Sequence, residues 1–217
     1  NWIKKIIVSG SPRHDKLFKN KQIKNNDSIQ VLIAPTPINQ IQGFDETKSH
    51  LKFEQILIKI CSILKKKNVK IILKLHPSQS YHNEIIKNII KNLDPNISIH
   101  LLTSVTDLIE SSDAIITITP EGWGPSTVIL ESIILQKPIM NIILDNHLHN
   151  FPYVQQNAIL TASDKSDFDD YLEKLIFNLD FRNELIENGQ KFLKSYLCEP
   201  GKASENLTRE IISHTEN

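Results

Sequence analysis

The sequence predicts an α/β domain with a doubly wound parallel sheet and additional helices toward the C-terminal end. Two observations predict it. Short apolar runs rich in β-branched residues alternate along the chain with longer segments of helical spacing. Within residues 112–144, two such runs flank one helical segment, which is the pattern of a βαβ unit. Because the strands of a βαβ unit run in the same direction, we expect a parallel sheet.

The individual elements follow from this alternation. A first strand is expected over residues 2–9, then a turn at GSPRHD and a polar linker over 19–28. Buried strands are expected over residues 29–34, 69–75, 97–102, 114–119 and 139–144, with a short edge strand over 158–161. Helices are expected over residues 48–67, 81–93, 106–111, 126–135, 167–179, 182–196 and 204–214, and the helix over 182–196 is expected to break near Gly189.

Composition limits the classes of function. The 25 basic and 25 acidic residues give zero formal net charge, which argues against a general nucleic-acid-binding protein. The two cysteines belong to no metal-type motif, so a reduced, cytoplasmic environment is expected. No apolar run approaches the roughly 20 residues that span a bilayer, so membrane association would be at most peripheral, at the inner face. The chain begins at Asn1, and we expect it to be part of a longer protein.

The junction between the strand over 114–119 and the next helix is the main functional signal. Gly122 and Gly124 allow a close approach of the backbone to a ligand. Ser126 and Thr127 place hydroxyl groups at the start of the helix, where free N–H groups and the positive end of the helix dipole favour anions. The pattern therefore predicts a phosphate site.

Glu131 lies four residues after Thr127, and so on the same face of the predicted helix. A carboxylate at this place could accept hydrogen bonds from both hydroxyls of a ribose whose phosphates rest on the helix end. The alternative is structural: Ser126 or Thr127 caps the helix and Glu131 is a solvated residue on its surface.

Three basic residues are further candidates. Lys74 and His76 lie at the end of the strand over 69–75, where His76 could donate to a phosphate or transfer a proton near neutral pH. Arg13 follows the turn at Gly10 and has a planar fork that suits oxyanions. The structural alternatives are a histidine that only satisfies backbone groups, a lysine that lines the sheet edge and a solvated arginine. No metal site is expected, because no third ligand accompanies the two loop histidines near residue 148.

Together, three motifs resemble a known family. GSPRHD after an opening strand, KLHP at a strand end and SDAIIT…GPSTVILESIILQKPI in this order resemble the C-terminal half of GT-B glycosyltransferases. Most similar are surface-polysaccharide enzymes of the CDP-glycerol glycerophosphotransferase type and the fold of UDP-N-acetylglucosamine 2-epimerases. The resemblance covers roughly residues 5–215.

The resemblance implies a fold and a set of roles. Residues 29–217 would form a Rossmann-like domain that binds the nucleotide-sugar, and residues 1–28 an interdomain strand and linker. Ser126 and Thr127, with the amides after Gly124, would hold the diphosphate, Glu131 the ribose, and His76 would face the pyrophosphate or donor sugar. The candidate substrate-binding residues are thus Arg13, Lys74, His76, Gly122, Gly124, Ser126, Thr127 and Glu131, with His76 as the candidate catalytic residue.

The resemblance also implies ligands and partners. A nucleotide-activated sugar or polyol would be the donor substrate, no cofactor would be needed, and the acceptor site would belong to an N-terminal domain or a partner subunit. The isolated chain would bind nucleotide without catalysing transfer. A non-catalytic binding module and a UDP-sugar epimerase-like enzyme remain alternatives.

In the segment TPEGWGPST, residues 119–127, the chain departs from the aspartate-serine-glycine-glycine run of the epimerases and the aspartate-tyrosine-serine-serine run of the glycerophosphotransferases.

Overall fold

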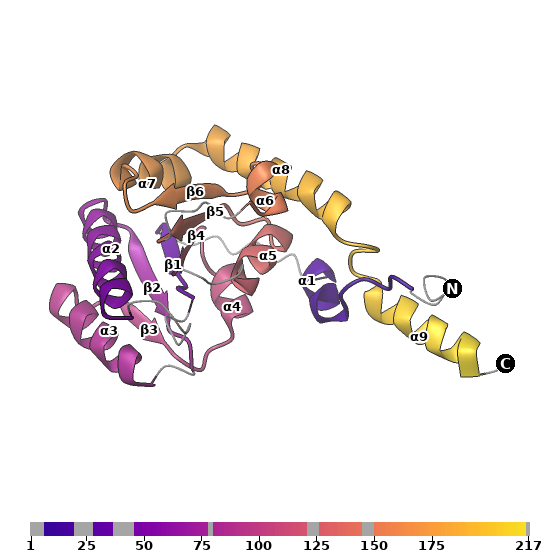
Figure 1. Cartoon of the computed structure of the whole chain (residues 1–217). Coiled ribbons are helices and arrows are strands. Elements are labelled where there is room, and N and C mark those ends of the chain that lie inside the picture. The colour runs from indigo at the N-terminus through magenta and orange to yellow at the C-terminus, as the bar shows by residue number, and fades with distance from the viewer. Residues whose placement is uncertain are drawn as a thin grey trace.

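A six-stranded sheet forms the centre of the molecule (Figure 1), as shown by a computed structural model that describes residues 7–19, 28–36, 46–77, 80–120, 126–144 and 150–215. All neighbouring strands are parallel, in the order β3-β2-β1-β4-β5-β6. This confirms the predicted doubly wound parallel sheet. The strands are β1 (Gln30–Ile33), β2 (Lys70–Lys74), β3 (Ser98–His100), β4 (Ala114–Thr119), β5 (Ile139–Ile143) and β6 (Leu160–Ser163).

The strands at the centre of the sheet are buried on both faces. Every residue of β1, β4 and β5 is buried, whereas β3 and most of β6 at the two edges are partly exposed. This is why the central strands are continuous apolar runs in the sequence, since helices cover both faces of a parallel sheet. Both edge strands differ from the prediction. β3 is shorter, and β6 begins two residues later than expected.

Two helical layers enclose the sheet. On one face lie α2 (Glu46–Lys66), α3 (Ser80–Leu93) and α7 (Phe168–Phe177), and on the other α4 (Val105–Glu110), α5 (Thr127–Ile134) and α6 (Pro152–Gln155). Helix α8 (Leu179–Tyr196) reaches from the first layer to the second, because its Leu185 packs in one core and its Phe192 in the other. Among the described helices, none is long and apolar enough to span a bilayer.

The N-terminal segment departs from the prediction. Residues 7–9 form no strand, and Ile7 and Val8 are 51% and 71% exposed; the rest of the predicted strand lies outside the described residues. The turn at GSPRHD is instead helical: a short 3-10 helix, Pro12–His14, runs directly into α1 (Asp15–Lys19). Pro12 favours this start, because its fixed φ suits the first position of a helix.

Contacts between the N-terminal segment and the C-terminal end of the chain hold both in place. The carboxylate of Asp15 accepts hydrogen bonds from the backbone N–H groups of Ala203 (3.0 Å) and Ser204 (2.6 Å), at the start of α9 (Ala203–Thr215). Hydrogen bonds from Ser204, first from its side chain and then from its backbone N–H, lower the pKa of Asp15. Gly10 has φ of +90°, and a Cβ atom there would lie 2.4 Å from the carbonyl oxygen of Cys198. Figure 1 accordingly shows α1 beside the start of α9, which extends away from the sheet.

Helix α8 is continuous, so the break predicted near Gly189 is wrong. The glycine has a packing role instead. A Cβ atom at Gly189 would lie 2.9 Å from Cγ2 of Ile133 in α5, which is closer than side chains approach one another. Gly189 is therefore the point where α8 packs directly on α5, the helix that carries the candidate site.

Candidate functional site

The strand order has its switch point at the carboxyl ends of β1 and β4. From β1 the chain proceeds outward through β2 and β3, and from β4 it proceeds outward in the opposite direction through β5 and β6. Ligands of open α/β sheets bind at such a switch point, outside the carboxyl ends of the strands. The backbone N–H of Thr36, just after β1, donates to the carbonyl of Ile118 in β4 (3.0 Å), which holds the two strand ends together.

Helix α5 begins at this edge of the sheet. Ser126 is its N-cap, and the Ser126 Oγ accepts a hydrogen bond from the backbone N–H of Val128 (3.3 Å). The sequence left open whether Ser126 caps this helix, and the structure shows that it does. Thr127 is exposed at the first position of the helix. Gly122 and Gly124 lie outside the described residues. The start of α5 can still hold an anion, because an N-cap satisfies only one of the free N–H groups of the first turn.

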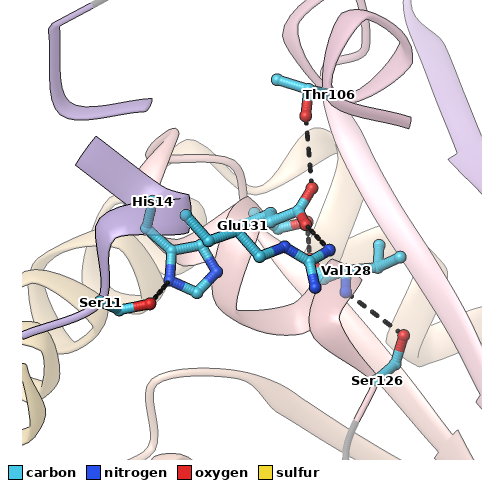
Figure 2. A network of polar contacts seen from close by, with 8 residues as sticks. Ser11, His14, Thr106, Ser126, Val128 and Glu131 are labelled. Atoms are coloured by element: carbon cyan, nitrogen blue, oxygen red, sulfur yellow. Dashed lines mark hydrogen bonds and ion pairs between the residues drawn. The ribbon is translucent and has the colours of Figure 1, made fainter. Parts of the chain in front are cut away.

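Glu131, on α5, is enclosed between this helix, the N-terminal segment and α4 (Figure 2). Its side chain is only 5% exposed. Nη2 of Arg13, from the N-terminal segment, donates to its Oε1 at 3.2 Å, and Oγ1 of Thr106, at the start of α4, donates to its Oε2 at 3.3 Å. Arg13 itself is 65% exposed. Glu131 is therefore not a solvated surface residue, and its partners come from positions 118 and 25 residues away in the chain.

His14 lies next to this ion pair, as Figure 2 shows. Its imidazole is buried, and its Nδ1 shares a hydrogen bond of 2.9 Å with Oγ of Ser11. Its Nε2 has no hydrogen-bond partner among the described residues. Burial lowers the pKa of His14, although the carboxylate of Glu131 acts in the opposite direction. A neutral imidazole at neutral pH follows, so Arg13 is the cation that pairs with Glu131.

His76 and Lys74 occupy the carboxyl end of β2. Nζ of Lys74 donates to the carbonyls of Leu75 (2.9 Å) and Leu101 (2.8 Å), so the ammonium group joins the ends of β2 and β3. Burial lowers the pKa of Lys74. Desolvation also lowers the pKa of His76, with a further contribution from the charge of Lys74. An exposed, neutral His76 could accept a proton at neutral pH.

The structure thus separates the candidate residues into two groups, both on the side of the sheet where the carboxyl ends of the strands lie. Arg13, Ser126, Thr127 and Glu131 gather around the first turns of α5. Lys74 is the last residue of β2, and His76 lies just beyond it. Strand β2 is two strand spacings, or about 10 Å, from β4. In the described part of the chain, no cluster of three or more histidine, cysteine or acidic residues could hold a metal ion.

Sequence reasoning missed Thr106 and His14 as members of the site. Thr106 had been assigned only to a short helix, and no local pattern links it to Glu131. His14 stood inside the noted GSPRHD motif, but its burial depends on the helical turn that the sequence did not reveal.

Several solved structures share this fold. The chain is similar to the C-terminal domain of the group 1 glycosyl transferase LpcC from Francisella tularensis (12% identity, TM-score 0.54, 88% of this chain and 98% of that chain). It is also similar to TarM from S. aureus, in a complex with fondaparinux, α-GlcNAc-glycerol and UDP (16%, TM-score 0.56, 87% and 37%). A third similar structure is UDP-GlcNAc 2-epimerase from Methanocaldococcus jannaschii (17%, TM-score 0.54, 97% and 56%). The fold is that of the C-terminal domain of GT-B glycosyltransferases.

The family follows from the sequence itself. The model of the CDP-glycerol:poly(glycerophosphate) glycerophosphotransferase family matches residues 1–212. The chain belongs to this family. No curated protein matches it. The chain spans only 37% of the length of TarM and 56% of that of the epimerase.

Proposed function

We propose that this chain is the donor-binding half of a glycosyltransferase or glycerophosphotransferase that acts in the synthesis of a cell-surface polymer. Its donor would be a nucleotide-activated sugar or polyol. The observation that carries the proposal is the group of polar residues at the start of α5. This group combines a helix end that suits an anion with the Arg13–Glu131 pair, near the carboxyl ends of the neighbouring strands β1 and β4, where the strand order reverses.

The family and the fold support this function. Transfer from CDP-glycerol is the activity that names the family. TarM, which has the same fold, was solved with UDP. We infer that the diphosphate of the donor lies at the first turn of α5, near Ser126 and Thr127, and that Gly122 and Gly124 would border it. The charges of the diphosphate would be met by N–H groups, hydroxyls and the Arg13 guanidinium.

His76 is the candidate for chemistry. The neutral imidazole at the end of β2 lies on the same edge of the sheet as α5, so it would face the donor sugar or the pyrophosphate. Lys74 would support it by fixing the strand ends and by disfavouring its protonation. In the complete enzyme, His76→Ala should reduce the rate of transfer and spare the affinity for the nucleoside diphosphate.

The acceptor site would come from another domain of the protein or from a partner subunit. The exposed apolar residues of α9, which are 41% to 56% exposed, favour a further contact surface there. They are Leu207, Ile211 and Ile212. A binding module without activity of its own is the second candidate function, and it shares the same nucleotide site.

Calorimetry on the chain as it stands tests the proposal. UDP, CDP and GDP are titrated separately at millimolar concentration, and we expect weak binding of at least one of them, with no transfer. Thr127→Ala should weaken this binding about tenfold or more, since it removes a donor to a charged ligand. Absence of binding by all three nucleotides would overturn the proposal.

A further inference from the structure

We propose that Glu131 is a positioning residue, which holds the guanidinium of Arg13 over the first turn of α5, and that Arg13 is the group that contacts the diphosphate. This inference rests on the proposed nucleotide site and assigns the roles within it. It differs from the role that the sequence suggests for Glu131, which is direct contact with ribose.

The occupancy of the carboxylate is the first argument. Oε1 of Glu131 accepts from Arg13 and Oε2 accepts from Thr106, so each oxygen already has a partner from a different element. With its side chain 5% exposed, Glu131 offers little surface to a ligand. A ligand that donates two ribose hydroxyls to this carboxylate would have to share its oxygens with these two partners and reach them through the small part of the side chain that is exposed.

The arginine has the opposite properties. Its side chain is 65% exposed, and only one of its five N–H donors is used in the contact with Glu131. A guanidinium with free donors in a fixed plane is suited to the oxygens of a phosphate. Because one end of this plane is tied to Glu131, less side-chain entropy is lost when a ligand binds to the other donors.

The position along α5 brings this guanidinium to the helix start. Glu131 is four residues beyond Thr127, which corresponds to about 6 Å along the helix axis and to the same face. A group bonded to Glu131 therefore lies over the first turn. Figure 2 shows Glu131 on this helix together with Val128 and Ser126 at the helix start, and Nη2 of Arg13 lies 3.2 Å from Oε1 of Glu131.

Charge provides a further argument. A carboxylate one turn from the helix start would repel a diphosphate, and His14 is neutral and does not offset it. Only the Arg13 cation is seen to pair with this carboxylate among the described residues. Without Arg13, the site would hold an uncompensated negative charge beside an anionic ligand. Arg13 thus both neutralises Glu131 and presents donors to the phosphates.

Four proteins test the inference: the wild type, Arg13→Met, Glu131→Gln and the double variant. Each is titrated with inorganic pyrophosphate and with the nucleoside diphosphate that binds the wild type. We expect Arg13→Met to weaken both ligands about tenfold or more. Glu131→Gln should change the affinity for both ligands by one common factor, because it acts through Arg13. Added to Arg13→Met, it should restore part of the lost affinity for both, since it removes the uncompensated charge.

The matched control is the pair Arg209–Glu205 on α9, which has the same Nη2 to Oε1 distance of 3.2 Å but lies remote from α5. Arg209→Met and Glu205→Gln should leave both titrations unchanged. A loss in Glu131→Gln that is confined to the nucleotide and spares pyrophosphate would overturn the inference and indicate ribose contact. A Glu131→Gln variant without any effect would overturn it too. If the wild type binds neither ligand, the proposed function itself fails, which is a distinct outcome.

Discussion

At the scale of single residues, His82 is a strongly perturbed titratable group that lies away from the candidate site. It is 3% exposed at the start of α3, and within the described part of the chain neither of its ring nitrogens has a hydrogen-bond partner. The ring of His50 lies edge-on with a centroid distance of 4.2 Å, and that of Phe53 lies at 5.6 Å. Burial lowers the pKa of His82 to about 4, and His50 acts in the same direction.

His82 should therefore make the stability of the domain depend on pH. The unfolded chain takes up a proton at His82 near pH 6.5, whereas the folded protein resists this down to about pH 4. Stability is thus unaffected by this group above pH 6.5 and falls as the pH decreases from 6.5 to 4, by up to about 3 kcal/mol. His82→Phe should flatten this part of the profile, as measured by urea unfolding at several pH values. An unchanged slope in the variant would show that other groups cause the acid sensitivity.

At the scale of elements, the packing of α8 on α5 depends on Gly189. Gly189→Ala should lower the melting temperature, although alanine favours a helix by about 1 kcal/mol over glycine. The reason is the Cγ2 atom of Ile133, which would lie 2.9 Å from the new methyl group in a buried contact. Overpacking of this kind typically costs about 1–3 kcal/mol. In the double variant with Ile133→Ala, the loss should be smaller than the sum of the two single losses, as differential scanning calorimetry would show.

The central elements could be predicted because local sequence determines them. β4 has the predicted boundaries, and β1, β2 and β5 differ from prediction by one residue at one or both ends, since burial on both faces requires continuous apolar runs. The helical turn at Pro12–His14 and the start of α1 were not predictable from their few residues, because their partners are distant in the chain: Arg13 bonds to Glu131, and Asp15 bonds to Ala203 and Ser204. The sequence likewise identified Arg13 and Glu131 as candidates but could not show their contact, which joins residues 118 positions apart.

At the scale of the whole molecule, the side of the sheet where the carboxyl ends of the strands lie is suited to ligands, and the side with their amino ends is not. Hydrogen–deuterium exchange with a saturating nucleoside diphosphate should therefore protect amides at residues 11–14, 105–107 and 126–131. The opposite edge should remain unchanged, because its polar groups bond to one another: Gln30 N–H donates to Asp113 Oδ2 (2.8 Å), and Arg182 Nη2 donates to the Asp113 carbonyl (3.1 Å). Protection at residues 28–31 or 111–114 would instead place the ligand at the amino ends of β1 and β4 and contradict the proposed site.

The strand order also has a consequence for the synthesis of the chain. β1 pairs with β2 on one side, but its other neighbour, β4, follows only after β2, α3, β3 and α4. A nascent chain that has emerged as far as α4 therefore exposes one edge of β1, whose residues are all buried in the finished protein. Such an unpaired apolar edge is a target for chaperones and for aggregation. The pairing of β1 with β4 is thus also the contact along which the earlier and later halves of the polypeptide join.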